Sequence, residues 1–284
     1  MVQALERFRQ QINKRFLRKG SLLLATFFLP PLIQVTSLQG DYQALAYLGL
    51  LNTPQLVQED NQLAFENVLC SCVRIQVDGH YGSGSIFRMT EDEIIIATNR
   101  HVLQYWNQDS YITFFDGAVA SGELIGVADE ADVGFVRVPI TSFTYDKLLT
   151  YRNVRLVPLE GDEDSEQEEN VTSIANDSKT NVTSIANDSK TNVTWLSIDL
   201  ATDIWKPQLY QGVIIDALVK LEDFEVEMLY GRGAAQAGMS GGGVFDGYGN
   251  YIGMMTGGTL QDEIAAVPAE TVWQEYRELV GQPL

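Results

Sequence analysis

Apolar and polar residues alternate along the part of the chain that begins near residue 70. Val73, Ile75 and Val77 are separated by polar residues, and the turn-forming pair Asp78-Gly79 follows them. A period of two is typical of a strand with one buried face. The same reasoning predicts further strands over residues 83–89, 93–98, 111–115, 118–127 and 132–138. Because no long helical pattern separates these strands, they predict a β-barrel or a β-sandwich.

A second set of strand patterns begins after about residue 142. Its clearest members cover residues 213–220, 224–230, 243–245 and 251–255. Residues 269–280 follow Pro268 with apolar side chains at helical spacing, which predicts an amphipathic helix at the end of the sequence. Two β units in tandem fit a chain of 284 residues.

An acidic and repetitive insertion interrupts the second β unit at residues 160–192. Seven acidic residues lie within 160–169, and the unit N-V-T-S-I-A-N-D-S-K-T then occurs at 170–180 and 181–191 before it restarts at Asn192. Eleven largely polar residues repeated without change cannot bury a core, so we expect a solvated, disordered loop. The acidic run lacks the spaced ligands and the turn glycine of a dedicated calcium loop.

The first 37 residues have the order of an export signal. Basic residues gather within 1–20, and an almost purely apolar stretch of about 14 residues follows from Leu22 to Val35. A membrane-spanning helix needs about 20 residues. We therefore expect a periplasmic or extracellular protein, either cleaved after Ser37 or anchored by an uncleaved N-terminal segment; a transit peptide fits the apolar block less well. Residues 38–67 are expected to form a short helix and a connector.

Charge and composition narrow the list of partners. The chain has 19 Lys and Arg residues against 38 Asp and Glu residues, a net charge of −19, which repels nucleic acid and anionic lipid. Membrane contact is expected only through an uncleaved N-terminal segment. Two histidines and two cysteines are too few for a His-rich or Cys-ligated metal centre. Cys70 and Cys72 would lie about 7 Å apart on a strand, beyond easy disulfide reach, and we expect no cofactor and no metal.

The strongest chemical signal is a serine among glycines, G-M-S-G-G-G at residues 238–243. Glycines let the backbone turn sharply and let amide groups face a developing oxyanion. The segment also fits G-x-S-x-G, the nucleophile motif of α/β-hydrolases, but those enzymes place their histidine after the serine. No histidine follows Ser240, which excludes that class.

A histidine and an aspartate precede the serine in suitable positions. His101 leaves a buried-type strand at a bend, whereas His80 lies in a turn and is expected to be exposed. Asp132 opens an apolar strand, where its carboxylate can be buried beside a histidine. Each of these residues alone also fits a structural role. Their order His, Asp, Ser differs from the subtilisin order, and together they predict a nucleophilic triad.

Five segments resemble one known family, the trypsin-like serine peptidases, and within it the bacterial HtrA-type branch. The segments are T-N-R-H-V at 98–102, D-V-G-F-V-R-V from Asp132, G-M-S-G-G-G-V-F-D at 238–246, Gly82-Ser83-Gly84-Ser85 and Ala266-Val267-Pro268. The resemblance covers about residues 68–280. It implies the all-β chymotrypsin fold of two tandem six-stranded antiparallel β-barrels, at 68–142 and 143–284, with a C-terminal helix.

The sequence departs from the family pattern at three places. Met239 stands where digestive members carry an aspartate that pairs with a freshly cut N-terminus, so that activation route is not expected. Gly243 stands where a proline is usual, a change that the backbone should tolerate. Only about 44 residues follow Ser240, too few for the peptide-binding PDZ module that many HtrA-type proteases append.

The resemblance implies a serine endopeptidase that hydrolyses unfolded polypeptides through an acyl-enzyme. His101 would act as the base, Asp132 would orient it, and Ser240 would attack. The remaining implied site residues are the oxyanion-hole amides of Gly238 and Ser240, a pocket floor at Ala234, and pocket walls at Met255 and Thr256. With no acid at the pocket floor, apolar residues of small to medium size are the expected preference.

Two other functions share this fold. A catalytically silent binding protein would keep the barrels and lose a triad member, and all three members are present here. An esterase is open because acyl transfer chemistry does not distinguish an ester from an amide. A nucleotide-binding interpretation of Gly82-Ser83-Gly84 fails because a third glycine and a following helix are missing.

Overall fold

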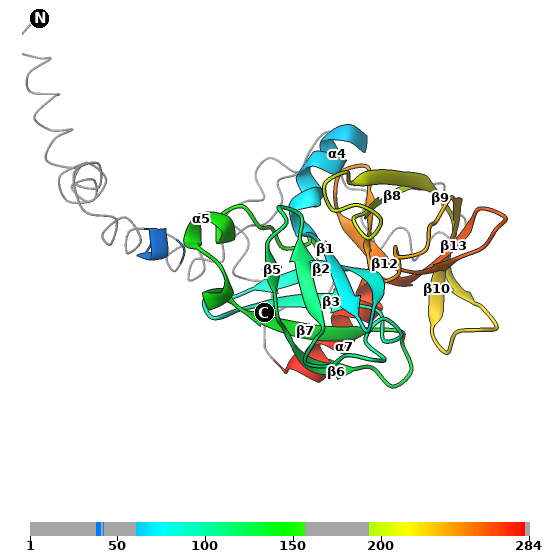
Figure 1. The fold of residues 1–284 in the computed structure, drawn as a ribbon. Helices are drawn as coiled ribbons and strands as arrows, with labels where there is room; N and C mark the ends of the chain where they lie inside the picture. The colour runs from blue at the N-terminus through cyan, green and yellow to red at the C-terminus, as the bar shows by residue number, and fades with distance from the viewer. Residues whose placement is uncertain (1–37, 41, 43–60, 157–192, 282–284) are drawn as a thin grey trace, which may run out of the picture.

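The computed structural model describes residues 38–40, 42, 61–156 and 193–281. The expected export segment, most of the expected connector and the acidic repeat insertion lie outside these described residues. From Asn61 onward the chain forms two β units that lie side by side, with the last helix running beneath the first (Figure 1). No helix within the described residues is long and apolar enough to cross a membrane.

The first unit follows a short helix, α4 (Asn61–Val68), where we expected the end of the connector, and a 3₁₀ turn, η1 (Leu69–Ser71). Its sheet has seven strands in the order β5-β4-β1-β2-β3-β7-β6. Asp78 and Gly79 join the first two strands with positive φ values of 47° and 78°, as a tight hairpin turn requires. The strands are β1 (Cys72–Val77), β2 (His80–Met89), β3 (Glu93–Thr98), β4 (Tyr111–Phe114), β5 (Val119–Ala120), β6 (Glu123–Val127) and β7 (Gly134–Pro139).

The second unit is a closed six-stranded barrel in the order β10-β13-β12-β11-β8-β9. Two short helical turns, η2 (Ile140–Ser142) and α5 (Tyr145–Leu148), come between the units along the chain, and α7 (Ala269–Val280) follows the barrel. The strands are β8 (Val193–Asp199), β9 (Gln208–Lys220), β10 (Glu227–Gly233), β11 (Gly243–Asp246), β12 (Tyr251–Gly258) and β13 (Glu263–Pro268).

The predicted fold class is confirmed, with two differences in the first unit. Its strands form a sheet where we expected a barrel, whereas the strands of the second unit close into one. We expected six strands in the first unit, and the structure has seven, because the predicted strand over 118–127 is divided in two. Its first part pairs with β4 through Ile112 and Ala120, whereas its second part pairs with β7 through Leu124 and Val136. This segment therefore links the two edges of the sheet, and Gly122 allows the close approach, since a Cβ there would lie 2.5 Å from Val136.

Contrary to our expectation, the two cysteines do not lie on the same strand. Cys70 lies in η1, and Cys72 begins β1 with its thiol directed at the Val68 carbonyl. Both cysteines are free. Burial raises the pKa of both thiols above the ordinary range, so neither is the low-pKa thiolate that reactive cysteines present.

An aromatic cluster holds the two units together beneath α7. Phe87 of the first sheet lies 5.1 Å from Tyr276 and 5.8 Å from Trp273 of the helix, measured between ring centroids. The same ring lies 6.2 Å from Tyr251 of the barrel. Buried aromatic pairs at these distances each add about 1 kcal/mol beyond the burial of their area. The helix therefore fixes how the loops of one unit face those of the other.

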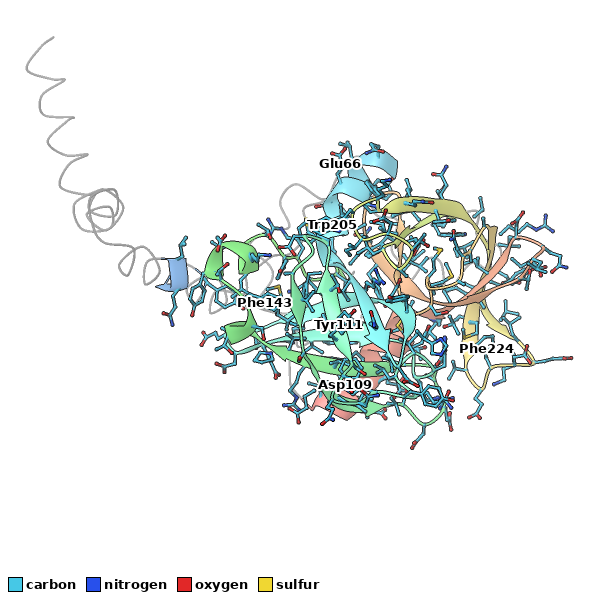
Figure 2. The ribbon with its side chains drawn as sticks, viewed as in Figure 1. Glu66, Asp109, Tyr111, Phe143, Trp205 and Phe224 are labelled. Carbon is cyan, nitrogen blue, oxygen red and sulfur yellow. The ribbon has the colours of Figure 1, made fainter. Side chains whose placement is uncertain are left out.

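A second contact between the units comes from the loop after β8. The Trp205 side chain in that loop is exposed over 72% of its surface, yet its ring covers Gly117 of the first sheet, where a Cβ would lie 2.3 Å from it. Figure 2 labels Trp205 close to the strands of the first unit.

Candidate active site

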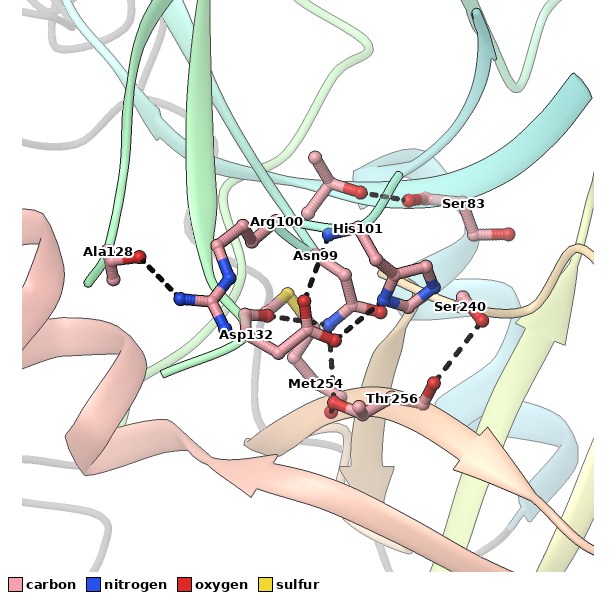
Figure 3. Close-up of polar contacts among 10 residues, drawn as sticks. Ser83, Asn99, Arg100, His101, Ala128, Asp132, Ser240, Met254 and Thr256 are labelled. Atoms are coloured by element: carbon pink, nitrogen blue, oxygen red, sulfur yellow. Dashed lines mark hydrogen bonds and ion pairs between the residues drawn. The ribbon is translucent and has the colours of Figure 1, made fainter. Parts of the chain in front are cut away.

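Strand pairing brings His101 and Asp132 to the same end of the first sheet. The antiparallel register of β3 and β7 ends at Thr98 opposite Gly134, so residues just after β3 and just before β7 emerge together. His101 Nδ1 lies 2.7 Å from Asp132 Oδ2, and the His101 backbone N–H donates to Asp132 Oδ1 at 3.0 Å. One carboxylate thus orients both the ring and the main chain of the histidine (Figure 3).

The two members of this pair differ in exposure. The Asp132 side chain is exposed over 13% of its surface and the His101 side chain over 48%. We expected a strand over 132–138, but β7 begins at Gly134. Asp132 stays in the preceding turn because its carboxylate and its carbonyl are both engaged by the segment around His101.

The residues before His101 fasten the histidine loop. The Arg100 guanidinium donates to the backbone carbonyls of Ala128 and Asp129, so it braces the turn that leads to Asp132. Asn99 is fully buried, and its amide donates to the Asp132 carbonyl at 2.9 Å and to Thr256 Oγ1 at 3.2 Å. Asn99 therefore connects the aspartate loop of the first unit to β12 of the second.

Glycines shape the loop that carries Ser240. Gly238 and Gly241 have φ values of +97° and +85°, a region that side chains disfavour. The Met239 N–H donates to the Gln236 carbonyl at 3.1 Å, and the Gly242 N–H donates to the Met239 carbonyl at 2.9 Å. Two consecutive tight turns therefore present Ser240 in the loop just before β11.

Met239 anchors this loop in the barrel. Its side chain is 1% exposed and belongs to the core cluster that contains Trp195 and Val244. Its sulfur also accepts the Gln236 N–H at 3.3 Å. At the position where the sequence departs from the aspartate of digestive members, the chain thus has an apolar side chain buried in the barrel core.

The serine and the histidine are not hydrogen-bonded to each other in this structure. The Ser240 hydroxyl donates to the Thr256 carbonyl at 3.3 Å. In the view of Figure 3, Ser240 lies on the side of the imidazole away from Asp132. Hydrogen bonds of catalytic groups are often long or misdirected without substrate, so this arrangement is compatible with a triad.

Two amide groups of the serine loop remain available. Within the part of the chain that the structure describes, the N–H groups of Gly238 and Ser240 donate to no other group. They flank Met239, whose own N–H is used inside the turn. The predicted oxyanion hole requires unused amide donors of this kind.

The three predicted pocket residues differ in environment. Ala234 is exposed, and the methyl group of its neighbour Ala235 lies against Gly258, where a Cβ would be 2.7 Å away. The Met255 side chain is buried in the barrel core. Thr256 is buried, and its carbonyl accepts the Ser240 hydroxyl. Their assignment to a substrate pocket stays a prediction.

A cavity of about 260 Å³ adjoins His101. The first unit lines it with Arg100, His101, Glu130 and Asp132, and the turn between β9 and β10 lines it with residues 223–226. We expected Phe224 to begin a strand, but β10 starts at Glu227, and Phe224 lies in the turn between β9 and β10 (Figure 2). The sequence did not indicate that residues 223–226 line a cavity, because the alternation of apolar and polar residues continues through the turn between β9 and β10.

Among the described residues, no group of three or more His, Cys, Asp or Glu side chains is placed to hold a metal ion. The predicted triad residues use their polar atoms on one another and on neighbouring backbone groups. The predicted base and its predicted orienting acid lie on the first unit, and the predicted nucleophile lies on the second.

Comparison with protein families places the chain in a class. The sequence matches the family model of the trypsin-like peptidase domain over residues 82–254, which is more than half of the chain and includes His101, Asp132 and Ser240. The chain therefore belongs to the trypsin-like peptidase family and is classified as a serine-type endopeptidase. A search of curated proteins found no match.

Solved structures share the fold at low sequence identity. An inactive serine-to-alanine mutant of Rv3671c from M. tuberculosis H37Rv is 14% identical with a TM-score of 0.55, and the alignment covers 82% of this chain and 98% of that one. The HtrA-type protease AlgW with a decapeptide is 15% identical with a TM-score of 0.57, over 80% and 68% of the chains. Deg5 is 18% identical with a TM-score of 0.55, over 78% and 96%. The predicted chymotrypsin-like fold is confirmed.

Proposed function

We propose that this protein hydrolyses peptide bonds through a triad of Ser240, His101 and Asp132. The observation that carries the proposal is the double contact of Asp132 with His101, at 2.7 Å to the ring and 3.0 Å to the backbone N–H. An aspartate bound to Nδ1 leaves Nε2 as the basic nitrogen. The imidazole is thereby prepared to accept a proton on the side away from Asp132.

The reaction then follows from the groups at hand. Ser240 Oγ leaves its bond to the Thr256 carbonyl, attacks the substrate carbonyl carbon and gives its proton to His101 Nε2. The oxygen of the tetrahedral intermediate is met by the N–H groups of Gly238 and Ser240, each worth about 3 kcal/mol. His101 next protonates the leaving amine, and a water molecule attacks the acyl-enzyme by the reverse route.

Peptide hydrolysis with matched histidine variants tests this proposal. Ser240→Ala and His101→Ala are expected to reduce kcat for an unfolded protein substrate to background, because each removes a reacting group. His80 is exposed at the start of β2, so His80→Ala serves as the control and should retain full activity. Retained activity in Ser240→Ala would contradict the mechanism. Turnover of activated esters without any peptide cleavage would identify an esterase.

Substrate preference is proposed from charge rather than shape. The negative chain attracts basic substrates over long range, but salt weakens this attraction. Ala234, at the predicted pocket floor, offers a Lys or Arg side chain no partner, and burial of an unpaired charge costs several kcal/mol. We expect cleavage after Ala, Val or Leu in a peptide library. A dominant preference for Lys or Arg that persists at roughly 0.3 M salt would contradict the Ala234 assignment.

Export is the cellular part of the proposal. It rests on the basic and apolar order of residues 1–37. Mass spectrometry of the N-terminus in the soluble exported fraction and in the membrane fraction tests it. A chain that begins after Ser37 in the soluble fraction indicates cleavage, a full-length chain in the membrane fraction indicates an anchor, and a full-length cytoplasmic chain contradicts export.

A further inference from the structure

Ser83 connects the first unit to the serine loop of the second through two hydrogen bonds. Its hydroxyl donates to the Gly238 carbonyl at 2.7 Å, and its backbone N–H donates to the Ser240 carbonyl at 2.8 Å. The side chain lies on β2 and is 2% exposed. One residue therefore holds the two carbonyls on either side of Met239.

Ser83 is itself fixed from the histidine side. Its carbonyl accepts the Thr98 hydroxyl at 2.7 Å, and Thr98 ends β3, three residues before His101. Gly241 is pressed into the same contact, since a Cβ there would lie 2.1 Å from Thr98 Oγ1 and 2.3 Å from the Ser83 carbonyl. The position of Ser83 is thus coupled to the segment that carries the base.

The Gly238 carbonyl belongs to the same residue as one predicted oxyanion donor. The peptide group between Gly238 and Met239 is held at both ends, because the Met239 N–H donates to the Gln236 carbonyl at 3.1 Å while the oxygen accepts Ser83 Oγ. Without the hydroxyl, only one end is held. Gly238 has no side chain to restrict its rotation, so its N–H is then free to turn away from the oxyanion position.

From these contacts we infer that Ser83 is a positioning residue for the oxyanion hole, acting through the Gly238 carbonyl. The inference rests on the proposed peptidase function and adds to it a side chain that touches neither substrate nor nucleophile Oγ. Ser83 should matter when negative charge develops on the substrate oxygen and not when substrate first binds, since only interactions specific to the transition state raise kcat.

The chain supplies a matched control on the same strand. Ser85 lies two residues further along β2 and is fully buried, and its hydroxyl has no hydrogen-bond partner among the described residues. Ser85→Ala removes the same atom from the same buried face. The difference between Ser83→Ala and Ser85→Ala therefore isolates the bond to Gly238.

The experiment measures kcat, KM and inhibition by a peptide boronic acid for the wild type, Ser83→Ala and Ser85→Ala. The boronate forms a tetrahedral adduct on the serine and places an oxygen where the oxyanion develops. For Ser83→Ala we expect kcat to fall by about 10- to 100-fold, less than the loss of a direct donor, with KM within about 2-fold. Boronate affinity should fall in parallel, and Ser85→Ala should match the wild type in all three.

Two further readouts separate positioning from general stability. The pH profile of kcat/KM should keep its shape in Ser83→Ala, because the His101–Asp132 pair is untouched. Ser83→Cys keeps a side chain of the same shape with a slightly larger atom and a weaker donor. Its kcat should lie between those of the wild type and Ser83→Ala, and it replaces Ser83→Ala as the test if that variant proves unstable. Equal kcat in the Ser83 and Ser85 variants would overturn the inference. A wild type without peptidase activity would instead overturn the proposed function.

Discussion

The two β units contribute unequal halves of the proposed triad. In the first unit, His101 and Asp132 are already paired through two hydrogen bonds, and a sheet register defines their positions. In the second unit, Ser240 bonds to Thr256 instead of His101 and is carried by a glycine loop. The acid–base half is built into one sheet, whereas the nucleophile half depends on contacts that cross between the units.

The largest effect is expected when the pairing of Asp132 with His101 in the first unit is disrupted. Asp132→Asn should keep the fold but lower kcat by about 10⁴-fold, because the amide favours the wrong histidine tautomer. Steady-state kinetics with a peptide substrate measure this. Asp129, which is exposed in the same turn, provides the control, and Asp129→Asn should retain activity. An equal loss in both variants would show that the turn, and not the Asp132 carboxylate, is responsible.

The next largest effect is expected at the close contact between the two units at Gly241. Gly241→Ala places a methyl group 2.1 Å from Thr98 Oγ1 at a φ of +85°, so we expect a loss of about 3 kcal/mol in unfolding free energy together with most of the activity. Chemical denaturation measures the stability. Gly257 has open space around its Cβ position. The unfolding free energy of Gly257→Ala should therefore lie within about 0.5 kcal/mol of the wild-type value. Similar losses of unfolding free energy for both variants would contradict a close contact at Gly241.

A double-mutant cycle sharpens the comparison at Asn99. Asn99→Ala and Thr256→Val each remove one end of the 3.2 Å bond between the units. Each single variant should lower the unfolding free energy by about 1–3 kcal/mol. The double variant should lower it by about 1 kcal/mol less than the sum of the two single losses. Unfolding free energies and kcat should be measured on all four proteins. Additive losses would show that this bond does not couple the aspartate loop to β12.

The smallest expected effect concerns the charge of Glu275 on α7, which is repelled by Asp129 and Glu130 in the turn before Asp132. Burial raises the pKa of Glu275 on α7, and repulsion from Glu278, Asp129 and Glu130 adds to the shift. The folded state therefore disfavours this carboxylate, a destabilisation that is present at neutral pH and absent below the ordinary pKa of glutamate.

Glu275→Gln should accordingly raise the melting temperature at pH 7 and leave it unchanged near pH 3.5, below the ordinary glutamate pKa of about 4.3. Solvent screens the group, so the gain should stay under about 1 kcal/mol. Thermal unfolding at the two pH values measures the difference. A stabilisation of the same size at both values would show that packing, rather than charge, is responsible.

The same contrast explains what could be predicted from sequence. The strand over 93–98 and the helix over 269–280 agree with β3 and α7, since the first is a continuous apolar run and the second has apolar side chains at helical spacing. Strand β8 was not expected, because Val193 and Thr194 read as another copy of the repeat although they begin a strand. Strand β13 was also missed. Its Glu263-Ile264-Ala265-Ala266 start carries little alternation.

Chemistry within one unit was easier to predict than contacts between units. The order and strand contexts of His101 and Asp132 indicated that they would meet, and their ring contact is 2.7 Å. The bonds from Ser83 to Gly238 and from Asn99 to Thr256 join residues 155 and 157 positions apart. Local pattern carries no information about such pairs, and the sequence indicated a role for neither the Ser83 nor the Asn99 side chain.

Gly243 illustrates the same limit. Its place in the motif suggested only that the backbone tolerates a glycine where a proline is usual. In the structure a Cβ at this position would lie 2.5 Å from the Phe245 ring and 2.8 Å from Ser85 Oγ. The ring occupies the space beside the backbone, so a larger residue at this position would require the buried Phe245 ring to move.

The most direct test of the central claim is covalent labelling by a fluorophosphonate, followed by intact mass measurement and peptide mapping. Such a reagent reacts with a serine that a neighbouring base activates. The wild type should gain one adduct on Ser240, His80→Ala should label at the same rate, and His101→Ala and Asp132→Asn should label far more slowly. Absence of an adduct on Ser240 in a protein that still cleaves peptides would contradict the account.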